Sequence, residues 1–424
     1  MRYAEIFNEI VDIMHHDYAG CYDKTGWDNP EVFSEKINLL EEQGALTPYS
    51  FENIVQDYLL DFQDPHMFFK RSEKGEEKQL EIGFKVRRFE NKLYVISVGS
   101  EKRLKKGESL LSFDGVSVKQ LVTKHQSELM EKVAERERWE DILKRYSTCV
   151  VEDHKGNQQE MKIELYEKEK YQPQHTVENI DESTLLITLT DFDKGEVMKK
   201  LIHDYQQDLE QTPNLIIDVR LNIGGSTQTF QEFLTYLFPE GSFDLADMLD
   251  YKMEFHCTER NCSLQKKKTD NYLKETEDED TRKWILNYQK GWIDNWGKGF
   301  IDFNNSGEKT SHWIQGKPNP ENIVLLTDVK CGSAGDIFVE IVQQSSKVTV
   351  VGRPTANINA YSNLIDKEWD NTFELWYPTS KIVSENEVEG GQPDIYIPWT
   401  PEYLDRDVDM DEGVRLLKQQ SVSK

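Results

Sequence analysis

The sequence is short of positive charge. Its 51 lysine and arginine residues stand against 78 aspartate and glutamate residues, which leaves a formal net charge of −27. A protein that binds DNA or RNA needs a basic surface to neutralise phosphates, so this composition argues against nucleic acid or an anionic membrane as a partner. The acidity itself indicates little beyond solubility.

Long apolar runs and targeting signals are also missing. No stretch approaches the ~18 apolar residues of a membrane span. The first twenty residues, MRYAEIFNEIVDIMHHDYAG, have neither a basic start followed by an apolar block nor a small-residue cleavage site. Such a start is not typical of a signal peptide, and we expect a protein that is not membrane-bound.

Cysteine is scarce and odd in number. The five cysteines are Cys21, Cys149, Cys257, Cys262 and Cys331. At least one of them cannot pair within the chain, which together with the missing signal peptide predicts a reduced, cytoplasmic protein. Cys257 and Cys262 have C-x4-C spacing, but no second pair stands at zinc-binding spacing, so we predict no metal site.

What is present suffices for a folded protein of two or three domains. Hydrophobic residues make up 37% of the 424 residues and aromatic residues 11%. Residues 1–75 are predicted to be mainly helical, because Ile6, Ile10 and Met14 recur at helical spacing. A second apolar-periodic stretch, 51–62, ends near Pro65, which leaves His66 just beyond the helix.

Two further regions follow. Residues 80–168 carry short strand signals separated by turn signals, which predicts a small β-rich domain with one or two helices. From residue 171 to 424, strands alternate with helices, and this pattern favours an α/β core with a largely parallel sheet. Residues 240–317 interrupt it, and we interpret them as an insertion or lid.

The first candidate site follows a buried strand. In NLIIDVRLNIGGS, Gly224 and Gly225 come after the strand and before a predicted helix. Paired glycines allow backbone N–H groups to point into a cavity, where they can stabilise a developing oxyanion. A plain strand-to-helix turn explains the same residues.

The second candidate is Ser333 in KCGSAGDIF, which follows the apolar run NIVLLTD. At the start of a helix, free N–H groups and the helix dipole favour negative charge, and the N–H of Ala334 could join the glycines in one oxyanion hole. Ser333 also fits a simple helix N-cap. A nucleophilic serine needs a base, and His66 is the best placed of nine histidines, although a lone histidine in such a setting is more often structural.

With these residues assembled, the chain resembles the S41 peptidases, the C-terminal processing and tricorn-core serine proteases. The segments that carry the resemblance are DFQDPHMFF, LIIDVRLNIGGS, NIVLLTDVKCGSAGDIF, KVTVVGRPTANINAYSN and EGGQPDIYIP. The resemblance implies a crotonase/ClpP-like protease sheet with helices for residues 171–424. Residues 80–168 resemble a PDZ-like domain through LKKGESLLSFDGVSV, with Glu108 where aspartate is usual. In the family such a domain binds extended peptides by strand addition.

The departures from the family pattern decide which catalytic set to expect. One S41 branch uses a Ser–Lys dyad, but the lysine position holds Ile358 here. The tricorn-like branch resembles a Ser–His–Glu arrangement, which points to His66 and to Glu389, with Glu387 and Glu385 close by as alternatives. Asn357 stands where the family often has glycine, and asparagine tolerates a left-handed backbone.

The resemblance therefore implies a serine-type endopeptidase that works without cofactor on a peptide or protein substrate. Ser333 would attack the carbonyl and form an acyl-enzyme, His66 would transfer the proton, and Glu389 would orient the imidazole. Gly224 or Gly225, with Ala334, would hold the oxyanion. Lys367 or Lys381 would be the alternative base. An inactive peptide-binding scaffold and a crotonase-like acyl-thioester enzyme are the competing readings, and the sequence carries no signal for the oligomeric state.

Overall fold

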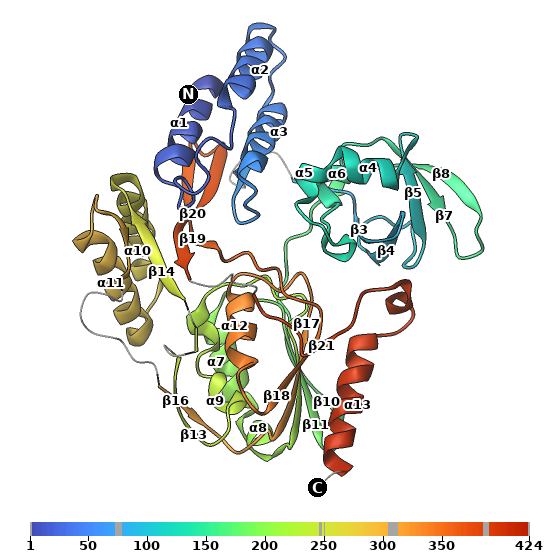
Figure 1. Ribbon diagram of the computed structural model, residues 1–424, viewed down its shortest axis with the longest axis vertical. Coiled ribbons are helices and arrows are strands. Elements are labelled where there is room, and N and C mark those ends of the chain that lie inside the picture. The colour runs from blue at the N-terminus through green and yellow to red at the C-terminus, as the bar shows by residue number, and fades with distance from the viewer. Residues whose placement is uncertain are drawn as a thin grey trace. The chain divides into compact units, whose positions relative to one another are not determined.

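The chain forms two compact units that interleave along the sequence. A computed structural model describes residues 2–72, 79–245, 248–249, 251–303, 313–384 and 390–422 (Figure 1). The first unit comprises Met1–Glu77, Asp250–Thr310 and Ile358–Val388, and the second Lys78–Leu249, Ser311–Asn357 and Glu389–Lys424. Each unit has a hydrophobic core of its own.

The first unit combines N-terminal helices with an antiparallel sheet. Its helices are α1 (Tyr3–His16), α2 (Pro30–Glu42), α3 (Pro48–Leu59), η1 (Leu60–Phe62), α10 (Glu259–Glu275) and α11 (Glu279–Asp294). Helix α1 buries Ile6, Ile10 and Met14, which confirms the predicted helical spacing. Helix α3 begins at Thr47, whose side chain accepts a hydrogen bond from the Ser50 N–H, as N-cap threonines commonly do.

The sheet of this unit draws on all three of its segments. Its strands are β1 (Phe68–Arg71), β14 (Lys252–Cys257), β15 (Gly299–Ile301), β19 (Tyr361–Trp369) and β20 (Phe373–Val383), in the order β1-β20-β14-β15 with β19 also paired to β20. Strands β14 and β15 belong to the stretch that the sequence marks as an insertion. That stretch is thus built into a sheet, where β14 pairs with β20 from a later part of the chain and β15 forms the edge of the strand order.

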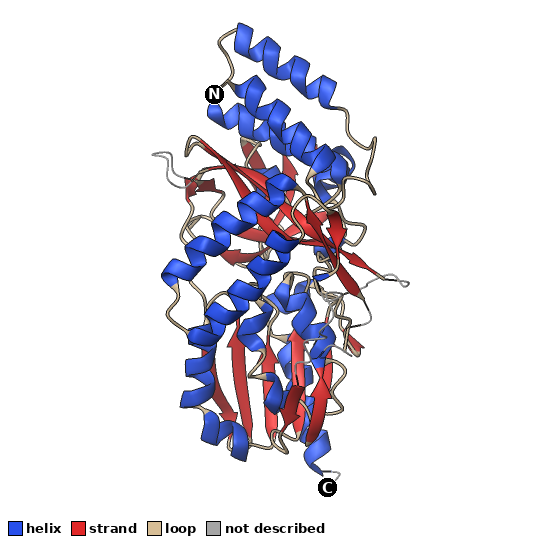
Figure 2. Ribbon diagram, turned by 90° about the vertical axis from the view of Figure 1, so that its left-hand side faces the viewer, coloured by secondary structure: helices blue, strands red, loops and turns tan. Residues whose placement is uncertain are grey.

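The second unit contains the parallel sheet predicted from the sequence. Its strands are β10 (His175–Asp181), β11 (Thr184–Leu189), β12 (Asn214–Asp218), β17 (Asn322–Thr327), β18 (Val348–Gly352) and β21 (Ile395–Tyr396), in the order β10-β11-β12-β17-β18-β21. The pairings from β11 through β21 are parallel, and only β10 joins antiparallel. Figure 2 shows the long strands of this sheet running side by side.

Both faces of this sheet are covered by helices, which explains why its strands are continuously apolar. One face packs against α7 (Gly195–Asp204), α8 (Gln206–Gln211), η3 (Thr227–Phe230), α9 (Leu234–Leu237) and α12 (Ala334–Val342). The other face packs against α13 (Val408–Val422), where Leu417 meets Ile216 and Val324. The sheet therefore presents its strand ends, and not its faces, for chemistry.

Residues 79–168 of the same unit form a second, strand-rich core. Its elements are β2 (Leu80–Glu81), β3 (Phe84–Phe89), β4 (Lys92–Val98), β5 (Ser109–Phe113), β6 (Val116–Ser117), α4 (Val118–Lys124), α5 (Gln126–Leu129), η2 (Ala134–Arg136), α6 (Glu140–Leu143), β7 (Thr148–Glu152), β8 (Gln158–Lys162) and β9 (Tyr166–Glu167). Strands β3, β4, β5, β7 and β8 lie in one antiparallel sheet. A two-stranded antiparallel sheet, β13 (Gly241–Asp244) with β16 (Trp313–Gly316), and η6 (Pro401–Leu404) complete the unit.

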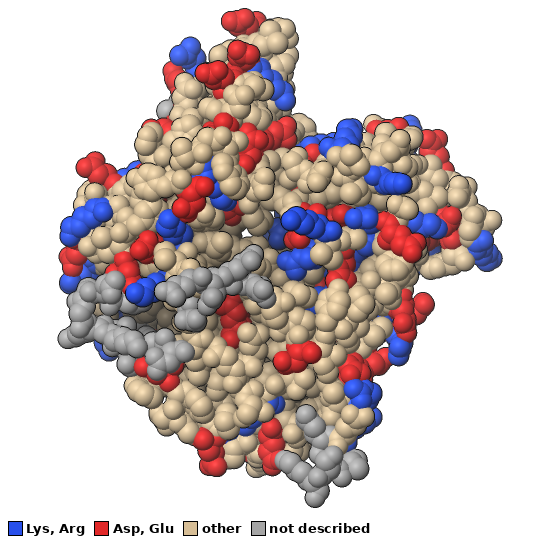
Figure 3. Space-filling view, in the orientation of Figure 1, with Lys and Arg blue, Asp and Glu red and all other residues tan. Residues whose placement is uncertain are grey.

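The surface carries many charged side chains of both signs. Acidic and basic side chains are interspersed on the face shown in Figure 3. None of the helices in the described part of the chain is both long and apolar enough to cross a membrane.

Candidate active site

The turn after β17 places Ser333 at the start of a helix. Ser333 is the N-cap of α12, and its N–H donates to Oδ2 of the buried Asp336 at 3.0 Å. Its backbone angles, φ 57° and ψ −121°, lie in a region that residues with a side chain rarely adopt. A strained serine between a strand and a helix is the arrangement that exposes the nucleophile in α/β-hydrolases.

The two glycines after β12 lie against this turn. Gly224 has φ 88°, and a Cβ built on it would lie 2.6 Å from Cβ of Ser333 and 3.0 Å from N of Ala334. Gly225 has φ 137°, and a Cβ there would lie 2.4 Å from the carbonyl carbon of Phe192. Both positions therefore require glycine, and the structure brings the predicted residues Gly224, Ser333 and Ala334 together.

Asn222 ties the glycine turn to the serine turn. It is fully buried, and its backbone carbonyl accepts from the Gly332 N–H at 3.0 Å. Its side-chain Oδ1 accepts from the Gly224 N–H at 2.9 Å, while Nδ2 donates to the Leu189 carbonyl at 3.0 Å. The Gly224 N–H is thus already engaged, which leaves Gly225 as the better donor of the two glycines.

The loop after β18 supports the serine turn from the other side. The Ala356 N–H donates to the Cys331 carbonyl at 2.6 Å, and the Asn357 N–H donates to Oδ1 of Asp336 at 3.0 Å. Asn357 has φ 52°, so the predicted left-handed backbone is confirmed. Arg136 donates to the carbonyls of residues 354, 355 and 356 at 2.9 to 3.2 Å and holds this loop in place.

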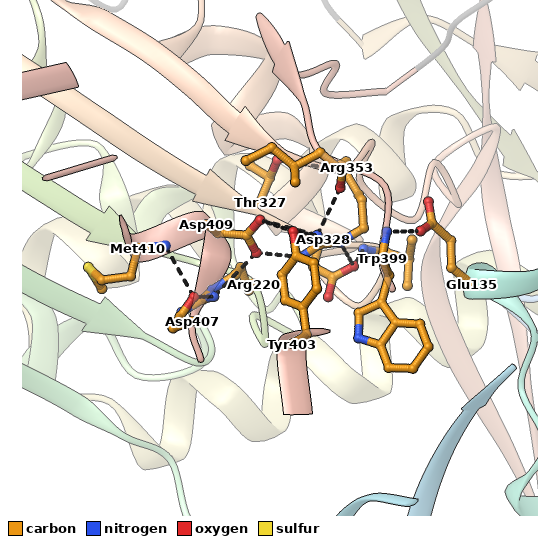
Figure 4. Close-up of polar contacts among 12 residues, drawn as sticks. Glu135, Arg220, Thr327, Asp328, Arg353, Trp399, Tyr403, Asp407, Asp409 and Met410 are labelled. Atoms are coloured by element: carbon orange, nitrogen blue, oxygen red, sulfur yellow. Dashed lines mark hydrogen bonds and ion pairs between the residues drawn. The ribbon is translucent and has the colours of Figure 1, made fainter. Parts of the chain in front are cut away.

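A buried network of arginines and aspartates anchors the strand ends beneath these loops (Figure 4). Arg353 is only 1% exposed; its Nε donates to Asp328 at 2.8 Å and its Nη2 to Asp409 at 2.5 Å. Burial alone would raise the pKa of Asp328, but the guanidinium groups of Arg87 and Arg353 hold it below its usual value. Asp328 lies at the start of the serine turn, so the network fixes the turn at its base.

Arg220 extends this network along the sheet. It forms a bidentate pair with Asp218 at 2.6 and 3.0 Å and another with Asp407 at 2.6 and 2.8 Å. A third contact, at 3.3 Å, reaches Asp409. These contacts attach the segment leading into α13 to the ends of β12 and β18.

Removing the Asp409 carboxylate is expected to destabilise the protein strongly. Asp409→Ala leaves the buried Arg353 short of a partner, and breaking a buried ion pair in this way typically costs about 3–5 kcal/mol. Asp411, two residues further on, pairs with Arg406 at 3.1 Å on the surface. Asp411→Ala is the matched control and should cost no more than about 1 kcal/mol. Urea unfolding midpoints measure both, and equal midpoints for the two variants would contradict the expectation.

His66 belongs to the first unit, where its surroundings are well defined. It follows η1 and the Asp64–Pro65 step, and it is buried. Its N–H donates to Oδ1 of Asp64 at 2.9 Å, and its Nδ1 lies 2.8 Å from the Tyr361 carbonyl. Because a carbonyl only accepts, Nδ1 carries the proton and Nε2 is left as the proton acceptor.

The remaining candidates from the sequence are a late glutamate and two lysines. Glu389 and its alternatives Glu387 and Glu385 lie outside the described residues. Both candidate lysines are ion-paired: Lys367 with Glu9 at 2.8 Å and Lys381 with Asp23 at 3.2 Å. In the described ranges, no group of three or more histidine, cysteine or carboxylate side chains is arranged to hold a metal ion.

The sequence profile of Peptidase family S41 matches residues 183–397, just over half of the chain. The chain belongs to peptidase family S41. It is therefore a serine peptidase, and the family acts on peptide or protein substrates. The matched range contains the glycine turn, the serine turn and the loop after β18. Residues 1–182, which include His66, lie outside it.

Solved structures show the same fold over nearly the whole chain. Mature CPAF complexed with lactacystin superposes with a TM-score of 0.63 at 14% identity, over 95% of this chain and 97% of that chain. A serine-to-alanine mutant of CPAF gives 0.65 at 13% identity, over 95% and 96%. No curated protein sequence matches the chain. The fold is that of S41 proteases, with mixed α/β sheets and helices.

Several supporting residues escaped sequence reasoning. Asp336 stands three residues after Ser333, and this S-x-x-D spacing is a capping signal that could have identified it. Asn222 lies between the strand and the glycines without a distinctive pattern. Asp409 and Arg353 are 56 residues apart, and nothing local in the sequence links them.

Adding a methyl group to Gly224 is expected to damage catalysis more than stability. In Gly224→Ala the new Cβ would press on Ser333 and on the Gly332 carbonyl, 2.8 Å away, so the oxyanion donors would shift. Losing one such donor costs about 10²–10³ in kcat. Gly156 has a similar φ of 82° but open space around it, so Gly156→Ala is the control for backbone strain. Equal kcat values in the two variants would contradict the expectation.

Proposed function

We propose that this S41 peptidase is an endopeptidase that cleaves peptides or unfolded protein segments through an acyl-enzyme on Ser333. The strained backbone of Ser333 at the start of α12 carries this proposal, because it is the geometry of a nucleophile turn. A serine that served only as a helix cap would have no need of a left-handed φ.

The proposed reaction proceeds in two steps. Oγ of Ser333 attacks the peptide carbonyl while Nε2 of His66 takes its proton; the C–N bond then breaks and the imidazolium protonates the leaving amine. Water, activated by the same imidazole, hydrolyses the ester. The N–H groups of Gly225 and Ala334 would hold the oxyanion, with Gly224 allowing the close approach of the two turns.

Glu389 enters the proposal as the carboxylate that favours the imidazolium. The Nδ1–H of His66 is already bonded to the Tyr361 carbonyl at 2.8 Å. We therefore assign Glu389 an influence through its charge and not through a direct bond to the ring. Glu387 and Glu385 remain alternatives for the same role.

The strand-rich segment 80–168 has a proposed role in substrate capture. Its resemblance to PDZ-like domains supports binding of extended peptides by strand addition. A crotonase/ClpP-like form of the core sheet, a cytoplasmic location and the lack of nucleic-acid partners stay predictions from the sequence.

The test uses the intact protein. An unfolded protein substrate and a serine-reactive fluorophosphonate are each incubated with it, with and without a metal chelator. Cleavage that the fluorophosphonate abolishes and the chelator leaves unchanged is the expected result. Binding of peptides without cleavage or labelling would instead identify an inactive peptide-binding scaffold.

A further inference from the structure

We propose that Lys24 is a positioning residue for His66. Its buried ammonium group joins the two segments that hold the imidazole and thereby keeps Nε2 available as the proton acceptor. The catalytic part of this inference rests on the proposed role of His66, whereas the arrangement of the side chains is a property of the first unit alone.

The imidazole is held at two points that are far apart in the sequence. Its ring is fixed by the Tyr361 carbonyl, and its backbone is fixed by the carboxylate of Asp64. The first contact selects the tautomer of the ring, and the second fixes the position of the main chain from which the ring extends. If either segment moved, Nε2 would lose its defined position.

Asp64 is itself held by a buried hydroxyl. The residue is 4% exposed, and its Oδ2 accepts a hydrogen bond of 2.6 Å from the hydroxyl of Tyr18. Burial, and then the nearby Asp64 carboxylate, raise the pKa of Tyr18, so this hydroxyl remains a donor. A carboxylate so far from water requires compensation by a positive charge or by several donors.

Lys24 supplies that positive charge. It is 7% exposed, and its Nζ donates to the Tyr18 hydroxyl at 3.0 Å and to the Phe62 carbonyl at 2.6 Å. The same Nζ lies 4.5 Å from the ring centre of Tyr361, within the range of a cation–π contact. Burial lowers the pKa of Lys24, and Asp64 and Asp23 oppose that shift.

The three contacts of the ammonium group explain the proposed role. One reaches the segment that leads into Asp64 and His66, a second reaches the residue whose carbonyl holds the ring, and the third reaches the hydroxyl that holds Asp64. An apolar residue of similar volume could replace a buried ion pair without loss of stability. It could not bind a carbonyl, a hydroxyl and an aromatic face at once.

The first experiment compares the buried Lys24 with Lys268, a half-buried lysine of the same unit. Lys24→Met should lower kcat by about 100-fold, the effect of roughly 1 Å of misplacement, with KM within about twofold of the wild type. Lys268 is the matched control, because its Nζ donates to the Leu364 carbonyl at 2.9 Å and has no contact with Phe62 or Tyr18. Lys268→Met should keep the wild-type kcat. A wild-type kcat in Lys24→Met would overturn the proposal.

The second experiment measures the tautomer of the His66 imidazole directly. Proton–nitrogen correlation spectra of histidine-labelled full-length protein report the tautomer of each ring, and the spectrum of His66→Gln identifies the His66 signals. The wild type should show a single Nδ1–H tautomer, and Lys24→Met should show a mixture. An unchanged tautomer in Lys24→Met would overturn the proposal. Should Lys24→Met not fold, Tyr18→Phe removes only the hydroxyl link and should give the same change with a smaller loss of kcat.

The two readouts also separate this inference from the proposed function. A tautomer that depends on Lys24 in a protein without peptidase activity would support the positioning role and refute the function. If the protein is an active peptidase and neither its kcat nor the tautomer of His66 changes in Lys24→Met, the function is supported and the positioning role is refuted.

Discussion

Replacing Ser333 by alanine is expected to reduce cleavage of an unfolded protein by at least about 10⁴-fold and to abolish fluorophosphonate labelling. Removing the nucleophile of a serine protease costs up to roughly 10⁶ in kcat, because the remaining groups can only assist direct attack by water. The fold should tolerate the change, since the hydrogen bond from the Ser333 N–H to Asp336 involves the main chain and survives.

Ser345 provides the matched control for this variant. It lies just beyond the far end of α12, is buried, and donates from its hydroxyl to the Leu237 carbonyl at 2.6 Å. Ser345→Ala should lose about 1 kcal/mol of stability, as for one hydrogen bond, and keep both labelling and cleavage. Labelling that persists in Ser333→Ala would place the nucleophile elsewhere.

Replacing His66 by glutamine should lower kcat by about 10⁴-fold, the upper range for loss of a general base. Glutamine is close in size and can still donate a hydrogen bond to the Tyr361 carbonyl. The structure around residue 66 should therefore persist while the proton acceptor is lost. The rate of fluorophosphonate labelling should fall with kcat, because both report the reactivity of Ser333.

His16 serves as the control histidine of the same unit. It lies on the exposed end of α1, and His16→Gln should leave kcat unchanged. Full activity in His66→Gln would refute the Ser–His pair. Attention would then turn to Lys367 and Lys381, although each would first have to leave its ion pair.

The parallel sheet was predictable because its strands are buried on both faces. NLIIDVR, NIVLLTD and KVTVVG are apolar without interruption, and they form the adjacent strands β12, β17 and β18. The same reasoning located the glycine turn and the serine turn, since both follow directly from the ends of such strands. Positive φ at Gly224, Gly225 and Asn357 matches the residue types found there.

Helix prediction was less successful where side chains are buried on all sides. In place of the helix predicted after Gly225, the structure has only η3 and the short α9. Phe230, Phe233 and Leu237 are all buried, so the apolar spacing reflects the core and not one face of a helix. The helical stretch between β11 and β12 likewise breaks at Tyr205, between α7 and α8.

The support of the candidate site was hardest to predict from sequence. The partner of the His66 ring is a main-chain carbonyl, and a carbonyl gives no signal in residue types. Lys24 lies in a polar turn between α1 and α2, where a lysine would ordinarily be exposed. The contacts of the His66 ring and of Lys24 both depend on how segments far apart in the sequence pack together. Residue patterns predict the segments themselves but not this packing.

The distance along the chain between His66 and Tyr361 has a consequence for biosynthesis. The two residues are 295 positions apart, and the segment carrying Tyr361 follows the serine turn. At ~5–20 residues per second, a ribosome needs roughly 15–60 s to reach residue 361 after making His66. Throughout that interval the imidazole has no carbonyl to fix its tautomer. On the proposed mechanism, the nascent chain thus carries both Ser333 and His66 before the imidazole is oriented for catalysis.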